Sequence, residues 1–588
     1  MRLLNKLLLS AVVWLAGTAN AANTHLVDEA PVSISQPEPG VILVDFGRVA
    51  FGNVRLLPDE SAGGAVTVHF GEDFVDGRLN RDPQGTVRYA SAQVQLDGSA
   101  PVRAAPPANA RNTETGSADH PPAILTPPEW GVVLPFRWVE IEGWDGELLP
   151  GQIVRQSAFA RDWSDDAAHF ESSDELLNRI WELSRYSIKA TTFAGVYVDG
   201  DRERIPYEAD AYLNQLSHYA TDNDTQMSRD TFDHLMQYAT WPTEWPPHMV
   251  MMAHADWMHT GDAQWLVPRY EALKAKLLLD RTADNGLVSS SWWQRRNSDI
   301  VDWPRGERDD YEFTSRNTVV NAFHLLTLRQ MAELARVVGK ASDAEYFESI
   351  ADAAYPAFQQ AFFRPQAGLY RDGVGTDHSS VHANLFPLAF GLVPAEQRQA
   401  IVNWLYSRGM ACSVYAAQYL LEGLFENGGD VEALALITAP GDRSWRHMVD
   451  SGATVTWEAW DVRYKPNLDW NHAWGAAPAN LLPRYVLGAQ PLTPGWETAR
   501  IRPATGQLEF ARGTVPTPLG PIVLDWQDTG RFTLSLSLPE GMKARVELPA
   551  RGRSGTVTVN GEPAAATRDG RYWVLAQEVT GEVTLAVE

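Results

Sequence analysis

A long central stretch of helical periodicity, flanked by strand-like segments on both sides, constrains the fold of this chain most strongly. From about residue 170 to residue 490, apolar residues recur at helical spacing. Helices are predicted to begin near residues 173, 207, 224, 248, 263, 316, 342, 378, 395, 414, 430 and 474. Twelve helices with short and medium connections fit six helical hairpins closed into a ring, an (α/α)6 barrel. A helical solenoid is the alternative, but the stretch has no repeat of fixed period.

Two capping boxes are predicted at helix starts in this stretch. Ser172 precedes Glu175 by three residues, directly before the apolar positions of the first helix. Ser342 and Glu345 repeat this spacing. In such a box, the serine and glutamate side chains each accept a hydrogen bond from the other residue's backbone N–H group.

The flanking segments have the alternation of β-strands. Val41-Ile-Leu-Val-Asp-Phe46 and Phe136-Arg-Trp-Val-Glu-Ile-Glu142 precede the helical stretch, and Phe532-Thr-Leu-Ser-Leu-Ser-Leu538 follows it. Residues 101–128 are rich in Pro and Ala and are predicted to form a long loop. Val559-Asn-Gly-Glu562 contains the Asn-Gly turn that is typical of a β-hairpin.

A chain of 588 residues is too long for one hydrophobic core, so several domains are expected. The pattern predicts a signal peptide over residues 1–21 and an N-terminal β-sandwich domain over residues 22–168. It then predicts the (α/α)6 barrel over residues 169–490 and a C-terminal β-sandwich domain over residues 491–588.

The first 21 residues have the pattern of an export signal. Arg2 and Lys6 give a positive start, a mostly apolar run follows, and Ala19-Asn-Ala21 is a small-residue cleavage site. The apolar run is too short to span a bilayer comfortably. We therefore expect export to the periplasm or the medium after cleavage near Ala21, with no membrane partner.

Composition narrows the classes of partner. The net charge is −25, and no Lys/Arg cluster provides the basic face that nucleic acid requires, so no nucleic-acid partner is expected. Cys412 is the single cysteine, lies in an apolar stretch and is predicted to be a core residue. No His-x-x-x-His or comparable ligand spacing is present, so no metal and no cofactor are expected. The sequence indicates no oligomeric state.

The first candidate for chemistry is the acidic segment Val198-Asp-Gly-Asp-Arg-Glu-Arg-Ile-Pro-Tyr-Glu-Ala-Asp210. It holds five carboxylates and two arginines. Gly200 and Pro206 predict a loop that enters a helix near Tyr207. Loops at a barrel mouth are where catalytic groups collect, but charge density alone favours a solvated surface loop with ion pairs.

The second candidate is Gly452-Ala-Thr-Val-Thr-Trp-Glu-Ala-Trp-Asp461, in which Glu458 lies between two tryptophans. His472 follows shortly after. An acid in an aromatic frame is either a substrate-binding group or a paired core acid. Together with the first segment, it could supply the two carboxyl groups that glycoside hydrolysis requires.

Tryptophan is abundant, with 22 residues, and sugar pockets need flat apolar faces beside polar groups. Trp241-Pro-Thr-Glu-Trp-Pro246 is one aromatic cluster. A second cluster has Trp293, Asp299, Asp302 and Trp303, which could line a sugar site. The alternative is a loop packed on the barrel rim, and large helical cores also use tryptophan.

Together these segments resemble glycoside hydrolase family 78, the α-L-rhamnosidases, over most of the mature chain. The most specific match is Gly452–Asp461 followed by Leu468-Asp-Trp-Asn-His-Ala-Trp-Gly475. Matches elsewhere are Asp45-Phe-Gly-Arg48 with Gly71-Glu72, Asn317-Thr-Val-Val-Asn-Ala-Phe323, His378-Ser-Ser-Val-His-Ala-Asn384, and Ala511-Arg-Gly-Thr-Val-Pro-Thr-Pro-Leu-Gly520.

The resemblance implies an inverting glycosidase on an (α/α)6 barrel that releases terminal α-L-rhamnose from glycosides or polysaccharides. Glu203 matches the family's general acid, and Glu458 matches its general base. The family commonly has Asp-Cys-Pro-x-Arg-Asp-Glu-Arg-x-Gly-Trp-x-Gly-Asp, and this chain is two residues shorter before the acid. Tyr207 stands where Trp is common, and Pro206 and Ala209 stand where Gly is common.

The implied partner is a rhamnose-containing glycoside or oligosaccharide. The residues predicted to bind it are Asp199, Arg202, Tyr207, Asp210, Asp302, Trp303, Trp460 and His472.

Two other kinds of function remain open from the residues. One is another inverting hydrolase on a helical barrel, trehalase-like or uronide-specific. A uronide enzyme needs extra positive charge, whereas the candidate segments are acid-rich. The other is a carbohydrate-binding protein without catalysis. The two matched carboxylates argue against this alternative, because a protein that only binds sugar does not need them.

Overall fold

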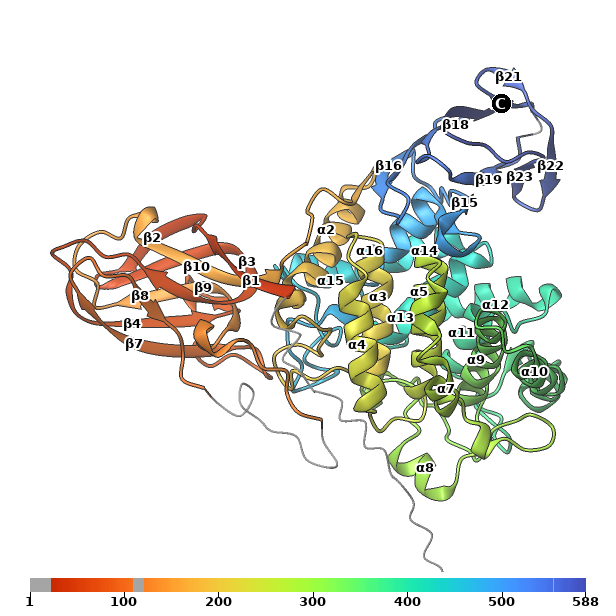
Figure 1. Ribbon diagram of the computed structural model, residues 1–588, viewed down its shortest axis with the longest axis horizontal. Helices are drawn as coiled ribbons and strands as arrows, with labels where there is room; N and C mark the ends of the chain where they lie inside the picture. Colours follow the sequence, from red (N-terminus) through yellow and green to blue (C-terminus); the bar gives the residue numbers. More distant parts are fainter. Residues whose placement is uncertain (1–22, 109–120, 554) are drawn as a thin grey trace, which may run out of the picture.

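The computed structural model describes residues 23–108, 121–553 and 555–588. Along the chain, a sheet region is followed by a helical region and then by further sheets (Figure 1). The predicted export signal lies outside the described residues. In the described part, none of the helices is both long and apolar enough to cross a membrane.

The N-terminal region is built around β3 (Val41–Leu56), a long strand whose register shifts between Asp45 and Ala50. Its first half pairs with β2, its second half with β8 and β10, and both halves pair with β9. The other strands are β1 (Thr24–Glu29), β2 (Ser33–Glu38), β4 (Gly63–Gly71), β7 (Tyr89–Asp97), β8 (Val102–Ala104), β9 (Leu134–Glu142) and β10 (Ile153–Ala160). The stretch 101–128 was predicted to be a loop throughout, but β8 lies in it because it extends the sheet beside β3.

A short hairpin, β5 (Phe74–Val75) with β6 (Arg78–Leu79), follows β4. The apolar faces of the main strands form a core of their own, which includes Val44, Phe70 and Phe136. This core is separate from the larger one that fills the helical region.

Each of the twelve predicted helix starts lies within four residues of an observed helix start. The helices are α2 (Glu175–Ala190), α3 (Glu208–Tyr219), α4 (Gln226–Gln237), α5 (Pro246–Thr260), α6 (Ala263–Leu266), α7 (Tyr270–Leu273), α8 (Trp292–Asn297), α9 (Thr318–Val337), α10 (Ala341–Phe362), α11 (His382–Ala389), α12 (Ala395–Arg408), α13 (Val414–Glu426), α14 (Asp430–Ile437), α15 (Trp445–Asp450) and α16 (Ala477–Leu481). The short helices α7, α8 and α15 were not predicted. Cys412 is buried in the core of this region, as predicted.

Both predicted capping boxes are wrong. The cap of α2 is Asp174, whose carboxylate accepts hydrogen bonds from the backbone N–H groups of Leu176 and Leu177. Ser172 instead ends β11 (His169–Ser172) and bonds to Asn178. Helix α10 begins one residue before Ser342, so that serine lies inside the helix rather than before it.

Strand β11 pairs with β16 (Phe510–Val515), so a strand next to the start of the helical region belongs to a C-terminal sheet. That sheet runs in the order β11-β16-β17-β18-β24-β20-β21, and a second sheet runs β14-β15-β19-β23-β22. The remaining strands are β14 (Ala489–Pro491), β15 (Thr498–Ile501), β17 (Ile522–Asp528), β18 (Phe532–Ser537), β19 (Lys543–Pro549), β20 (Val557–Val559), β21 (Glu562–Pro563), β22 (Ala566–Asp569), β23 (Tyr572–Leu575) and β24 (Glu582–Val587).

Two local predictions in this region are confirmed. Burial alternates along β18, as the strict alternation of its sequence indicates. Asn560 and Gly561 form the turn between β20 and β21, and both have positive φ, which is what a two-residue hairpin turn requires.

Candidate active site

A pocket of about 660 Å³ opens into the helical region where the two acidic segments meet. Glu203 and Glu458 both line it, although they are far apart in the sequence. The wall includes Asp199, Arg202, Tyr207, Asp210, Trp241, Trp245, Trp303, His472 and Trp474. The structure therefore brings together both predicted catalytic residues and six of the eight predicted substrate-binding residues.

Hydrogen bonds within the loop that carries Glu203 hold its conformation. Asp199 and Ile205 exchange hydrogen bonds across it, because the backbone N–H of Ile205 donates to Asp199 Oδ1 at 3.1 Å and the backbone N–H of Asp199 donates to the carbonyl of Ile205 at 3.0 Å. Gly200 has φ of +92° and Arg204 has φ of +58°. Asp201 is turned into the protein, where it pairs with Arg204 at 2.6 Å, so it is not part of the pocket wall.

Glu203 is the more exposed of the two candidate catalytic acids, with 31% of its side chain accessible. The hydroxyl of Tyr207 donates to its Oε2 at 2.7 Å. Nε of Arg202 donates to its Oε1 at 3.3 Å. A partly exposed carboxyl group at the pocket wall is accessible to a substrate oxygen.

Glu458 lies deep, with 2% of its side chain accessible, between two cations. Nη1 of Arg202 donates to its Oε2 at 2.5 Å, and Nζ of Lys465 lies 3.0 Å from its Oε1. Each oxygen of the Glu458 carboxylate thus has a cationic partner. Because Arg202 touches both acids and its Nε and Nη1 are about 2.3 Å apart, the two contacted carboxylate oxygens are separated by at most about 8 Å.

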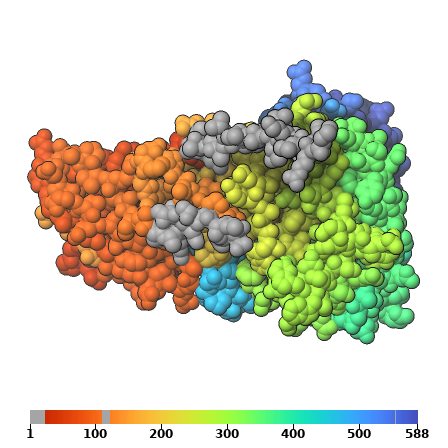
Figure 2. Space-filling view, turned by 60° about the horizontal axis from the view of Figure 1, so that its bottom comes forward, coloured from red at the N-terminus to blue at the C-terminus, as the bar shows by residue number. Residues whose placement is uncertain are grey.

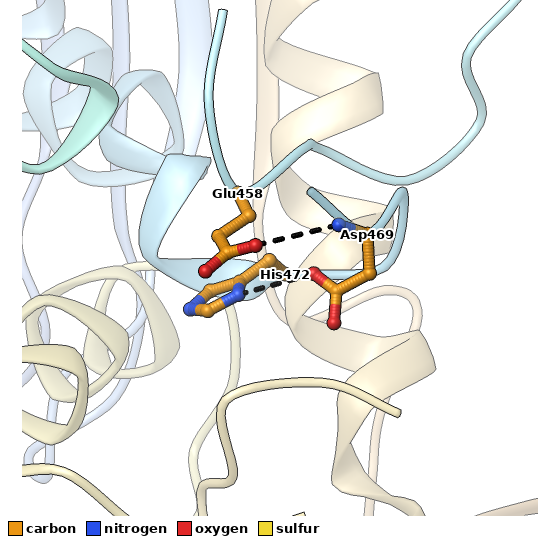
Figure 3. Close-up of side chains that lie close together, drawn as sticks. All are labelled: Glu458, Asp469 and His472. Atoms are coloured by element: carbon orange, nitrogen blue, oxygen red, sulfur yellow. Dashed lines mark hydrogen bonds and ion pairs between the residues drawn. The ribbon is translucent and has the colours of Figure 1, made fainter. Parts of the chain in front are cut away.

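His472 lies between two carboxylates. Its Nε2 is 2.7 Å from Asp210 Oδ1. Its Nδ1 is 3.4 Å from Asp469 Oδ1 (Figure 3). Burial alone lowers the pKa of His472, but the hydrogen bonds and charges of the two aspartates outweigh it and raise that pKa to about 10. His472 is therefore a cation at neutral pH, paired on both sides.

Glu458, Asp469 and His472 offer ligand atoms within 4.8 Å of one another, a spacing that a metal ion could use. Figure 3 shows the three side chains gathered at one point. The chemistry of these donors does not favour a metal. Both nitrogens of His472 already face carboxylates, and Glu458 already has two cationic partners.

Asp199 has one unused oxygen. Its Oδ2 is buried and makes no hydrogen bond among the described residues, although Nη2 of Arg202 lies 3.7 Å away. Burial, reinforced by the nearby Glu203, raises the pKa of Asp199 well above its usual range. A protonated carboxyl group in the pocket wall can both donate to and accept from a sugar hydroxyl.

Aromatic side chains form much of the remaining wall. Trp241 and Trp303 meet edge to face with ring centroids 6.5 Å apart. Trp245 and Trp474 also contribute, so the Trp241–Pro246 cluster does reach the pocket. These rings, beside several carboxyl groups, give the mixture of flat apolar and polar surface that suits a sugar.

Two predicted substrate-binding residues do not line the pocket. Asp302 is fully buried, and its carboxylate accepts hydrogen bonds from the backbone N–H groups of Trp303 and Ser413 and pairs with His382 at 2.6 Å. Trp460 is fully buried and donates from Nε1 to the carbonyl of Cys412 at 2.7 Å. Both are core residues that hold neighbouring segments together.

Other candidates from the aromatic clusters also lie outside the wall. Asp299 is buried and accepts a hydrogen bond from Asn317, while Trp293 is 59% exposed on α8.

Conversely, the sequence did not single out Asp469 and Lys465 as site residues. The signal for Asp469 was available, since it stands three residues before His472 in the most specific matched segment.

A sheet region, a helical region and further sheets, with two carboxyl groups in the wall of one pocket, form the multidomain arrangement that the sequence predicted for a glycosidase. Three family models match in succession: the bacterial alpha-L-rhamnosidase concanavalin-like domain over residues 35–159, the six-hairpin glycosidase domain over residues 165–486, and the C-terminal domain over residues 488–562. Because the central match covers more than half of the chain, the chain belongs to the bacterial α-L-rhamnosidase family.

Individual relatives agree with this assignment. The chain is 24% identical over 567 residues to an α-L-rhamnosidase of Alteromonas sp. (strain LOR), covering 88% of this chain and 57% of that protein. It is 23% identical over 552 residues to one of Streptomyces avermitilis, covering 88% and 49%. The chain thus spans about half the length of the curated relatives that it matches.

Solved structures show the same fold. The α-L-rhamnosidase of Dictyoglumus thermophilum matches with a TM-score of 0.76 and 17% identity, over 97% of this chain and 63% of that one. The Streptomyces avermitilis enzyme, solved with L-rhamnose, matches with a TM-score of 0.76 and 20% identity, over 96% and 54%.

Proposed function

We propose that this chain is an inverting α-L-rhamnosidase whose helical region is an (α/α)6 barrel and whose substrate is a rhamnose-containing glycoside or polysaccharide. The observation that carries the proposal is the pocket in which Glu203 and Glu458 both contact Arg202. A separation of at most about 8 Å between the contacted oxygens is compatible with the roughly 6.5–9.5 Å between carboxyl groups in inverting sites.

The surroundings of the two acids support different roles. Glu203 reaches the accessible part of the pocket, so it is the group that donates a proton to the glycosidic oxygen. Glu458 is buried and pairs with two cations, Arg202 and Lys465, so it is the group that removes a proton from the attacking water. Water adds to the anomeric carbon as the bond to the leaving oxygen breaks, and inversion follows from attack on the opposite face.

The remaining wall suits a neutral sugar. Asp199 and Asp210 provide hydrogen-bonding groups for ring hydroxyls, with Asp210 held in place by His472, and Tyr207, Trp241 and Trp303 provide flat surfaces. Arg202 and Lys465 are both paired with Glu458. Neither is available for a uronate carboxylate, which weighs against the uronide-specific alternative. Export after cleavage near Ala21 stays a prediction of the sequence.

The test is hydrolysis of a panel of aryl glycosides: α-L-rhamnoside, glucoside, arabinofuranoside and uronide. We expect release from the rhamnoside alone, with the β-anomer of rhamnose as the first product seen by NMR. Glu203→Gln and Glu458→Gln should each lower kcat by at least about 1,000-fold. Glu203→Gln should leave the melting temperature near that of wild type, whereas Glu458→Gln removes the partner of Arg202 and of buried Lys465 and should lower it. A preference for another glycoside would refute the substrate, and wild-type turnover in Glu458→Gln would remove that residue from the role of base.

A further inference from the structure

The Gly71-Glu72 motif at the end of β4 plays no part in the chemistry proposed above. Glu72 is buried, with 6% of its surface accessible, and does not line the active-site pocket. Its Oε2 accepts a hydrogen bond from the backbone N–H of Arg88 at 2.7 Å. Its Oε1 accepts one from Nδ2 of Asn471 at 3.0 Å. One carboxyl group of the N-terminal region therefore binds directly to the segment that carries His472.

Asn471 passes this connection on to the second active-site segment. Its Oδ1 accepts a hydrogen bond from the backbone N–H of Asp201 at 2.8 Å, and the asparagine is fully buried. Asp201 is two residues before Glu203. A chain of two hydrogen bonds thus joins Glu72 to the loop of the catalytic acid, and Asn471 fixes the distance between this loop and the His472 segment.

Residues 85–88 make a second connection between the same partners. Nε of Arg88 lies 2.9 Å from Asp201 Oδ2, and the backbone N–H of Thr86 donates to the carbonyl of Leu468 at 3.1 Å. A Cβ atom on Gly85 would lie 2.9 Å from that carbonyl, so only glycine lets the backbones approach this closely. Figure 2 shows a light-blue surface, the colour of residues near 460–470, where the orange N-terminal region meets the yellow-green helices.

We propose that Glu72 is a positioning residue for this active site: through Asn471 and Arg88 it holds the loop of Glu203 and the segment of His472 in one fixed arrangement. The N-terminal region is then part of the catalytic machinery rather than an appended module. This inference rests on the proposed function, because it assigns Glu72 a task in aligning the proposed acid. Buried polar networks of this kind specify a single geometry when every member is satisfied.

The protonation of Glu72 supports the arrangement. Burial, together with the charges of Asp201 and Asp469, raises the pKa of Glu72 to about 8 against the opposing hydrogen bonds from Asn471 and Arg88. At neutral pH the group is uncharged, so it adds no negative charge beside the two aspartates. Arg88 of the N-terminal region lies next to Glu72. Asp73 and Arg137 line a small cavity together with Glu72.

The experiment compares Glu72→Ala and Glu72→Gln with Glu140→Gln in the full chain. Glu140 is a matched control, because it is a fully buried carboxylate of the same region whose partners, Arg78 and Arg81, lie away from the pocket. We expect Glu72→Ala to lower kcat on an aryl α-L-rhamnoside by about 10- to 100-fold with KM within about threefold, and Glu72→Gln to recover part of the loss. Hydrogen exchange should speed up in peptides 199–205 and 467–472 in the Glu72 variants only.

Wild-type kcat and unchanged exchange in Glu72→Ala would overturn the proposal, as would an equal loss of kcat in Glu140→Gln. An inactive wild-type protein would instead refute the proposed function, and the exchange experiment would still decide the inference. Should neither Glu72 variant fold, the wild-type protein provides the test. The pKa of Glu72 is about 8 in the folded protein and 4.5 when exposed, so opening of this region becomes easier as pH rises from about 5 to 8. Protection in peptides 199–205 and 467–472 should fall over this range, after correction for the intrinsic rate, and constant protection would contradict the proposal.

Discussion

Replacing Gly200 with alanine tests whether the close contact between the two active-site segments sets the rate. The added Cβ would lie 2.8 Å from both Asn471 O and Asn471 Oδ1, and 3.1 Å from Asp469 Oδ2. Since carbon–oxygen contacts are about 3.3–3.6 Å, the segments must separate by about 0.5–0.8 Å. The φ of +92° adds backbone strain of about 1–3 kcal/mol. A misplacement of about 1 Å costs on the order of 100-fold in rate, so we expect kcat to fall by about 10- to 100-fold.

The control for this variant is Gly375→Ala. Gly375 has φ of +101° with nothing within 4 Å of the added Cβ, so the substitution introduces the strain without the clash. Both variants should lose a few degrees in melting temperature, and only Gly200→Ala should lose turnover of an aryl α-L-rhamnoside. The reasoning fails if Gly200→Ala keeps wild-type kcat, or if Gly375→Ala loses as much.

Three further outcomes are expected. Tyr207→Phe removes the hydroxyl that donates to Glu203, the proposed acid, at 2.7 Å. A lost hydrogen bond of about 1–2 kcal/mol predicts a 5- to 30-fold lower kcat/KM, and an unchanged value would show that the bond has no role. Because the pKa of His472 is raised from 6.5 to about 10, the stability that its charge contributes is fully present below pH 6.5 and is lost as pH rises to 10. The melting temperature of His472→Gln should therefore lie furthest below that of wild type near pH 6, and a gap that widens toward pH 10 would contradict this sign. Trp303→Ala should raise KM about tenfold, whereas Trp460→Phe should lower the melting temperature with KM within about twofold, and the reverse pattern would overturn their placement.

The helix starts were predictable because the spacing of apolar residues along one helix is local information. The capping boxes were not, because the choice of cap depends on what else the residues bind. Ser172 has the right residue type and spacing, yet β11 takes it into a sheet with β16, which is more than 300 residues away in the chain. Asp174 then caps the helix from one residue before its first turn. A four-residue motif contains no information about pairing between two strands so far apart in the chain.

The same distinction separates the parts of the active site. The family motifs located both acids in the sequence. They did not show which neighbouring side chains face the pocket and which face the interior, because this depends on the residues that each side chain binds. Asp201 pairs inward with Arg204, three residues away, and with the distant Arg88. Asp302 binds His382 and Ser413, which are also distant in sequence. The roles proposed for the two glutamates also depend on their neighbours. Glu203 has a hydroxyl partner and an open face, while Glu458 is enclosed by Arg202 and Lys465. The proposed acid and base therefore differ in burial and in the partner that only one of them has, Tyr207 or Lys465, and only the folded arrangement of both segments specifies these differences.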